Sequence, residues 1–147
     1  MTSCGSPPPK ENLSKDKVRL EATNMLYEYH NAIENGGLTA EFQFLDHSAD
    51  FFWVPPGYTS KLSYDSVYNI LTANDKALSS IVLQWDTLEV FPLSNEIATF
   101  TGRVTGRMKD TAGQISRTAI IESGTLIKRT DGWKLLSGQS ALLNTDD

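Results

Sequence analysis

The residues of this chain that could do acid–base or metal chemistry are few and widely spaced. The densest group lies in the segment HSADFFWVPPGYTS, where His47 and Asp50 follow Asp46. One histidine and two carboxylates could begin a metal ligand set, but they stand among turn-forming residues. We therefore expect no metal site and a solvated turn that Asp50 orders. The alternative is that Asp50 acts as a catalytic acid.

The second half of the chain offers another pair of charges, Arg103 and Glu122. If both side chains point away from the core, they form an ion pair on the surface or at an interface, which contributes little to stability. If both point inward, they are the best catalytic candidates in the chain. The faces of the strands that carry them decide between these alternatives.

Length and charge exclude some classes of function. A chain of 147 residues is long enough for one domain with a sizeable core. Its net charge of −5, without a cluster of basic residues, argues against a nucleic-acid partner. No apolar run is long enough to span a bilayer.

The single cysteine, Cys4, stands in the segment MTSCGSPPPKEN. A lone cysteine excludes an internal disulfide and a thiolate metal site. A cysteine followed by a polar, proline-rich tether resembles the mature start of a bacterial lipoprotein, although no apolar signal segment precedes it here. Two interpretations stay open: a lipid-anchored protein of the cell envelope whose true start lies upstream, and a cytoplasmic protein. Either way we expect a disordered tail over residues 1–12 and one domain over residues 13–147.

The elements that must position these residues are helices first and strands afterwards. A helix is predicted to begin near Ser14, a good N-cap, and to end at Asn35-Gly36-Gly37. A short helix capped by Thr39 follows. The strand DFFWV then ends at Pro55-Pro56-Gly57, since proline cannot donate to a sheet ladder. Ser63 caps a third helix.

Four long strands are predicted over residues 80–91, 96–109, 115–129 and 132–142. Asp131-Gly132 is the strongest hairpin signal, because Asp-Gly suits a type I′ turn. Helices that are segregated from an antiparallel sheet indicate the α+β class.

Alternation along the strands predicts which side chains face the helices. In the second long strand the apolar set should point inward: Ala98, Phe100, Gly102, Val104, Gly106 and Met108. A two-residue turn at Asp131-Gly132 pairs Leu136 with Ile127, and it directs a second set inward: Ile121, Ser123, Thr125, Ile127, Leu136, Ser140 and Leu142. This register places Arg103 and Glu122 on the outer face, whereas a slip of one residue would exchange the faces.

The order of the elements resembles the NTF2-like superfamily, and within it the SnoaL-like and ketosteroid-isomerase-like small proteins. The similarity rests on the helix ending in ENGG, on DHSADFFWVPPG and on RTDGWKLLSGQSAL, and it spans about residues 14–142. It implies a cone in which a curved antiparallel sheet wraps around three N-terminal helices, with a cavity for a small apolar molecule. It also implies a homodimer through the outer sheet face, and we expect no cofactor.

The resemblance also implies catalytic positions. Ketosteroid-isomerase-like members carry a carboxylate base just before the proline of the first strand, and that position is Val54 here. Tyr29 or Tyr27 stands where those members place a helix tyrosine. Many relatives have histidines on the last strand where this chain has Ser137 and Gln139. The chain thus departs from the isomerase pattern at its base. Four weak catalytic candidates remain: Asp50, Tyr29, Arg103 and Glu122.

The expected ligand pocket combines large side chains with a few hydroxyls. Its members are Tyr29, Trp53, Val54, Tyr58, Trp85, Phe100, Ile121, Ser123, Thr125 and Ser140. Three functions stay open: binding of a small apolar ligand, proton transfer on a small carbonyl or polyketide-like substrate, and an interaction module with a filled cavity. An ionisable side chain inside the cone would favour the enzyme.

Overall fold

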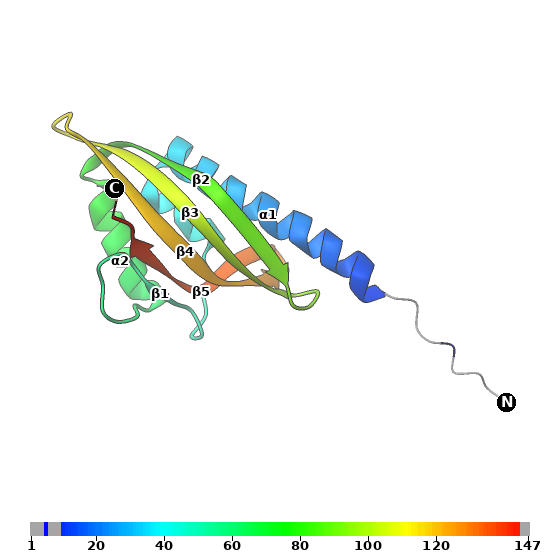
Figure 1. The fold of residues 1–147 in the computed structure, drawn as a ribbon. Helices are drawn as coiled ribbons and strands as arrows, with labels where there is room; N and C mark the ends of the chain where they lie inside the picture. The colour runs from blue at the N-terminus through cyan, green and yellow to red at the C-terminus, as the bar shows by residue number, and fades with distance from the viewer. Residues whose placement is uncertain (1–4, 6–9, 145–147) are drawn as a thin grey trace.

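The structure is a computed structural model that describes residue 5 and residues 10–144 (Figure 1). Within these residues there are three helical elements: α1 (Lys10–Gly36), the 3-10 helix η1 (Leu38–Phe44) and α2 (Tyr64–Asp75). The described part of the chain also contains five strands: β1 (Phe52–Val54), β2 (Leu78–Pro92), β3 (Ile97–Asp110), β4 (Ile115–Arg129) and β5 (Gly132–Leu142). The predicted α+β order is confirmed. Cys4, the predicted lipidation site, lies outside the described residues.

Two of the three predicted helix caps are wrong. The first helix begins at Lys10 rather than near Ser14. The N-cap of η1 is Gly37, with φ of 84°, and no side chain caps this element, so Thr39 lies inside it. The cap of α2 is confirmed, because the Ser63 hydroxyl accepts a hydrogen bond from the backbone N–H of Ser66. No helix within the described residues is long and apolar enough to cross a membrane.

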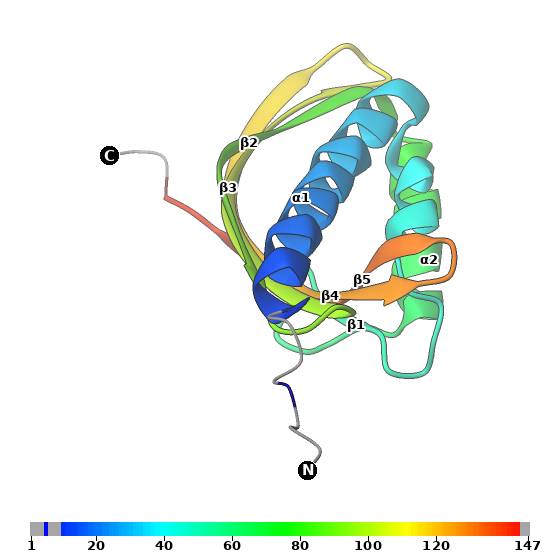
Figure 2. The same cartoon turned by 90° about the vertical axis from the view of Figure 1, so that its right-hand side faces the viewer.

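The strands form one mostly antiparallel sheet in the order β1-β5-β4-β3-β2. The last four strands are a meander of antiparallel neighbours, whereas β1 pairs in parallel with β5. The sheet curves around α1, and α2 lies on the side of α1 away from β2 and β3 (Figure 2). This curvature creates an interior between the helices and the concave face of the sheet.

The core joins α1 to the concave face of β2 and β3. Leu26 and Ile33 of α1 are fully buried. The indole N–H of Trp85 on β2 donates a 3.0 Å hydrogen bond to the backbone carbonyl of Leu26, which fixes the helix against the sheet. The predicted inward set of β3 is confirmed, since Ala98, Phe100 and Val104 are buried beneath the same helix.

The predicted register of the last hairpin is wrong in two respects. Its turn consists of Thr130 and Asp131, one residue earlier than expected, because Arg129 pairs with Gly132. A bulge between the Thr125 and Leu126 pairs then adds an extra residue, Leu136, to β5.

These two shifts exchange the faces of β4 relative to the prediction. Ser140 pairs with Glu122 instead of Ser123, and Leu126, which pairs with Leu135, is fully buried. The predicted inward positions of Ile121, Ser123, Thr125, Ile127 and Leu136 are therefore wrong, and so is the predicted outward position of Glu122.

The pairing of β3 with β4 gives the same orientation. Gly102 pairs with Glu122, and Arg103 pairs with Ile121. Since paired residues share a face of the sheet, Glu122 points inward with Gly102, whereas Arg103 and Ile121 point outward. Arg103 and Glu122 thus lie on opposite faces and do not form the predicted pair.

We predict that Gly102→Ala destabilises the protein by roughly 1–3 kcal/mol, because overpacking forces the surroundings to move. A Cβ atom at this position would lie 2.5 Å from the backbone carbonyl oxygen of Thr87 and 2.6 Å from the ring of Trp85. Gly106→Ala on the same strand is the matched control. Its nearest neighbours, Thr118 and Leu83, are side-chain ends at 3.0 and 3.1 Å. Urea unfolding should show the larger loss for Gly102→Ala, and equal losses would contradict the packing argument.

Candidate functional site

A cavity of about 410 Å³ lies between the helices and the concave face of the sheet. Its wall is mostly apolar, with aliphatic side chains from α2 and from the sheet, among them Leu71, Ile81 and Met108. The segment after β1 adds Pro55 and Pro56. Small-molecule sites have this size and character, with a few polar groups in an apolar surround. The cavity is not filled by side chains, although the interaction-module alternative required that it be filled.

Glu41 brings a carboxyl group to the cavity from η1. The sequence LTAEFQF turns Leu38 and Phe42 toward the core, and both pack against it. Glu41 is partly buried, and its Oε1 accepts a 2.7 Å hydrogen bond from the hydroxyl group of Tyr29. Tyr29 lies on α1, belongs to the buried core and is 5% exposed. The hydroxyl therefore holds the Glu41 carboxyl group in the cavity wall.

Glu122 brings a second carboxyl group from β4. Its neighbours on the ladder are Gly102 and Ser140, which have no large side chain to cover it. The residue is 4% exposed, and its Oε1 has no hydrogen-bond partner among the residues that the structure describes. Buried polar atoms are normally paired, so an unpaired carboxyl oxygen facing a cavity marks a place where a ligand could bind.

Burial shifts the proton affinity of both acids. Loss of solvent raises the pKa of Glu41 from 4.5 to about 7, although the hydrogen bond from Tyr29 acts in the opposite direction. Loss of solvent, followed by the charge of Glu41, raises the pKa of Glu122 from 4.5 to about 8. The two groups interact, so they titrate as a pair that holds about one proton near neutral pH.

The structure places five of the predicted site residues around this cavity: Tyr29, Trp53, Tyr58, Ser140 and Glu122. Their elements are far apart in the chain, and the parallel pairing of β1 with β5 brings Trp53 beside Gly138. Glu122 had been expected inside only if the faces of the strands were exchanged, and the register exchanges them.

Other predicted pocket residues lie elsewhere. Trp85 and Phe100 are in the core, with their rings edge to face at 6.1 Å. Val54 and Thr125 do not line the cavity. Two more predicted residues are on the outer face of the sheet. Ile121 is 44% exposed there, and the Ser123 hydroxyl is 2.7 Å from that of Thr101.

Two catalytic candidates lie on the surface. Asp50 is exposed, and its backbone N–H donates a 3.3 Å hydrogen bond to the hydroxyl of Ser48, so this contact orders the turn through the Ser48 side chain rather than through the Asp50 carboxyl group. Arg103 is half exposed and lies 3.9 Å from Asp86 on the outer face. Neither side chain lines the cavity.

The turn acids take structural roles. Asp46 is buried and accepts two hydrogen bonds from Arg129, at 2.7 and 2.9 Å. This guanidinium lowers the pKa of Asp46. The ring of His47 stacks on Tyr64 at 4.1 Å. Asp46 thus ties the turn to the last hairpin and is not available as an acid or a base.

Glu41 is the functional candidate that sequence reasoning missed. It lies in a short segment whose neighbours Leu38, Phe42 and Phe44 all pack against the core. A lone acid in a seven-residue apolar helix was the available signal. Its carboxyl group is held by a hydrogen bond from Tyr29, which lies on the preceding helix, and no local sequence pattern predicts this contact.

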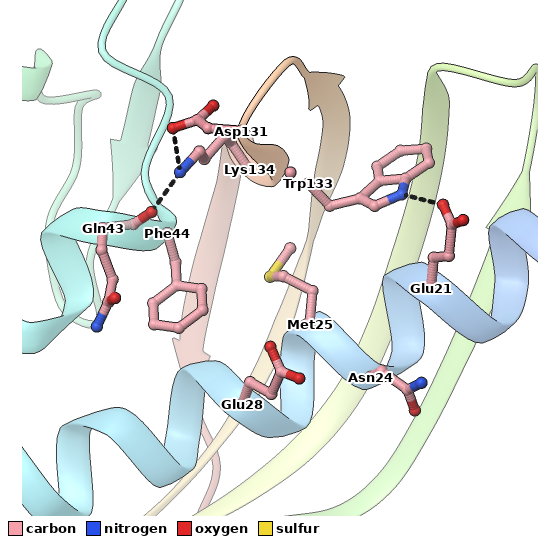
Figure 3. Close-up of a pocket in the computed structure, with 10 residues that line it drawn as sticks. Glu21, Asn24, Met25, Glu28, Gln43, Phe44, Asp131, Trp133 and Lys134 are labelled. Carbon is pink, nitrogen blue, oxygen red and sulfur yellow. Dashed lines mark hydrogen bonds and ion pairs between the residues drawn. The ribbon is translucent and has the colours of Figure 1, made fainter.

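A second pocket of about 560 Å³ lies between α1, the end of η1 and the β4–β5 hairpin (Figure 3). Three of the four charged side chains that line it, Glu21, Asp131 and Lys134, already have polar partners. Trp133 donates a 3.0 Å hydrogen bond to Glu21, while Lys134 donates to the carbonyl of Gln43 and lies 3.1 Å from Asp131. Because Glu21, Asp131 and Lys134 already have partners, we take the cavity between the helices and the concave face of the sheet, called the cone cavity below, as the candidate site.

No family model and no curated protein sequence matches this chain. Solved structures do match. An NTF2-like superfamily protein from Salmonella enterica is 17% identical, with a TM-score of 0.75, over 90% of this chain and 95% of that one. A candidate scytalone dehydratase from Novosphingobium aromaticivorans is 10% identical, with a TM-score of 0.75, over 88% and 89% of the two chains.

A hexachlorocyclohexane dehydrochlorinase from Novosphingobium barchaimii is also similar. It is 10% identical, with a TM-score of 0.70, over 90% of this chain and 91% of that one. The chain therefore has the NTF2-like α+β fold. At these identities the likeness establishes the fold and leaves the activity to be argued from the cavity.

We predict that, because the pKa of Glu122 is raised, the free energy of unfolding decreases as the pH rises. A carboxyl group whose pKa is higher in the folded protein takes up a proton on folding. The stabilisation that comes from this proton uptake is therefore complete below about pH 4.5 and is lost as the pH rises through about 8. Glu122→Gln removes this loss. The variant should match the wild type near pH 5 and exceed it at pH 8, by on the order of a few kcal/mol.

Urea unfolding at the two pH values measures this difference. Glu28→Gln, at an exposed position on α1, is the control and should change nothing. A difference between Glu122→Gln and wild type that is the same at both pH values would contradict the raised pKa.

Proposed function

We propose that this chain binds a small, mostly apolar molecule in its cone cavity and transfers protons on it, with Glu41 and Glu122 as the acid–base pair. One observation carries the proposal: two carboxyl groups from different elements reach the same apolar cavity. General acid–base catalysis needs a proton donor and a proton acceptor within reach of the substrate.

The two acids are suited to different roles. Between about pH 7 and 8 the pair favours a Glu41 carboxylate beside a protonated Glu122. Glu41 would then take a proton from carbon, with Tyr29 holding its carboxyl group in place. Glu122 would give its proton to a substrate oxygen. In an elimination, the C–H and C–O bonds break, a double bond forms and water leaves, so the pair ends with its proton moved from Glu122 to Glu41.

The wall of the cavity favours an uncharged substrate of modest size. The polar groups are few, and aliphatic or aromatic side chains make up the rest of the lining. We propose that the substrate is a small ketone, or an alcohol with an acidic C–H bond next to the carbon that carries the hydroxyl group. Proteins with the same fold include a candidate dehydratase and a dehydrochlorinase, whose named reactions both remove a proton from the substrate.

Binding without catalysis is the second candidate function. Val54 occupies the position where ketosteroid-isomerase-like proteins carry their base, and most of the cavity wall is apolar. A protein of this kind would hold its ligand without changing it. The two candidates differ in one measurable respect, which is whether bound ligand exchanges or loses a proton.

A homodimer and a lipid anchor remain further proposals. The outer sheet face exposes Val82, Phe91 and Ile121, a set that a second copy of the chain could cover. Analytical ultracentrifugation tests the dimer. Mass spectrometry of native protein tests a lipid on Cys4 and, with it, a place in the cell envelope rather than the cytoplasm.

We predict that the two carboxyl groups are required for proton transfer. Small ketones and β-hydroxy ketones in D₂O should show protein-dependent exchange or loss of the proton next to the carbonyl, followed by NMR. Glu41→Gln and Glu122→Gln should each slow the reaction by roughly 10²–10⁴-fold. Glu28→Gln should leave the rate unchanged. Ligands that bind in the cavity and never exchange a proton would favour the binding protein.

The pH profile offers an independent check through Tyr29. Activity should fall below about pH 7 as Glu41 becomes protonated, and above about pH 8 as Glu122 loses its proton. Tyr29→Phe removes the hydrogen bond that lowers the pKa of Glu41, so its acidic limb should move to higher pH. A rate that drops equally at every pH would instead assign Tyr29 a purely structural role.

A further inference from the structure

The cone cavity carries acids without compensating positive charge. Among the described residues that line it, the ionisable side chains are Tyr29, Glu41, Tyr58 and Glu122, and there is no lysine, arginine or histidine. The polar residues that α2, β4 and β5 add to the lining are Asn74, Thr118 and Ser140, all uncharged. An ionised carboxylate in a dry site needs a cation or a proton, and this wall provides no cation.

His30 does not provide the missing charge. It lies next to Tyr29 on α1, with the two rings 5.1 Å apart, and it stacks on Trp85 at 4.4 Å. Burial lowers its pKa to about 4, so the ring is neutral near pH 7. It is also absent from the cavity lining. The acid pair is therefore neutralised only by the proton that it shares.

Glu122 also has unused hydrogen-bonding capacity. The residue is only 4% exposed and lines the cavity. Within the described part of the chain its Oε1 has no hydrogen-bond partner. A buried acceptor without a donor costs free energy, and a ligand that brings a charged donor would recover it. The unpaired oxygen thus indicates the same missing group as the charge balance does.

We infer that the cavity is a binding site for a protonated lipophilic amine, whose ammonium group lies between the carboxyl groups of Glu41 and Glu122. An ammonium ion supplies one positive charge and three N–H donors, which suit two carboxylates and a hydroxyl such as that of Ser140. The apolar body would contact the aliphatic wall and the ring of Trp53. This inference does not require the chain to catalyse a reaction.

A metal ion fits the site less well than an ammonium ion. In the part of the chain that the structure describes, no three or more histidine, cysteine or acidic side chains are grouped so that they could hold a metal. Hard divalent cations take six or more oxygen ligands, and Glu41 and Glu122 are the only carboxylates in the described lining. An apolar wall suits an organic cation instead.

Binding of the amine is expected to release a proton. The free pair holds about one proton near pH 7, whereas an ammonium ion favours two carboxylates. Affinity should therefore rise with pH by about tenfold per pH unit between about pH 7 and 8, and more steeply below pH 7, where both carboxyl groups carry protons. Above pH 8 it should level off, because no proton remains to be released.

Calorimetry with three ligands of one shape tests the inference: cyclohexylmethylamine, cyclohexylmethanol and cyclohexanecarboxylate. Titrations in buffers of different ionisation enthalpy count the protons released. We expect the amine to bind at least tenfold more tightly than the alcohol at pH 8 and to release a proton near pH 7. The carboxylate should not bind. Equal affinity of amine and alcohol at pH 8, or no binding of the amine, would overturn the inference.

Variants locate the amine. Glu41→Gln and Glu122→Gln should each weaken amine binding by about tenfold or more, since each removes a charged hydrogen-bond acceptor. Cooperative urea unfolding of both variants would show that they remain folded. Unchanged binding of the alcohol would show that the cavity is intact. Glu28→Gln, beside the second pocket, should bind the amine as the wild type does. An amine affinity that both cavity variants retain would place the amine elsewhere and refute the site.

The amine titrations, taken together with the NMR measurement of ketone proton exchange, separate this inference from the proposed function. An amine that binds with proton release, while no ketone undergoes exchange, would support the amine site and count against the enzyme. Exchange of ketone protons without amine binding would support the enzyme and refute the amine site. Amine binding together with exchange supports both, and the amine should then compete with the ketone.

Discussion

Glu122 faces the cavity because its ladder partners are Gly102 on β3 and Ser140 on β5. This register depends on single-residue features: the extra Leu136 in β5 and the position of each hairpin turn. A side chain one place along β4 would point to the outer face, where Ile121 lies. The carboxyl group would then be solvated, its pKa would return to the usual range, and Glu41 would be left as the only acid in the cavity.

The burial of the two carboxyl groups underlies both the predicted loss of stability at higher pH and the chemistry proposed for the site. Their desolvation costs free energy whenever both are ionised, and no cation of the cavity wall offsets that cost. The pair therefore keeps a proton near neutral pH. A carboxyl pair that holds one proton near neutral pH can give up or accept a proton at physiological pH, whereas an exposed glutamate stays ionised there.

The fold was predictable from sequence because its signals are local and repeated. Alternation along β3 indicated the buried set correctly, and the Ser63 cap of α2 was readable within a few residues. The NTF2-like likeness seen in the order of elements agrees with the solved structures. The site was less predictable, since it depends on register. The Asp131-Gly132 signal located the hairpin but missed the turn by one residue, and nothing in the sequence of β5 marks Leu136 as the bulge.

Trp53 covers Gly138, where a Cβ atom would lie 2.5 Å from the indole ring, and the same ring lines the cavity. The width of the cavity at this point is therefore set by how closely one ring can approach a bare backbone. A shorter aromatic at position 53 would leave space above the glycine, and the cavity would lengthen toward β5 without a change in the sheet. Related proteins could thus diverge in the size of molecule they accept through substitutions at these two positions, while Glu41 on η1 and Glu122 on β4 stay unchanged.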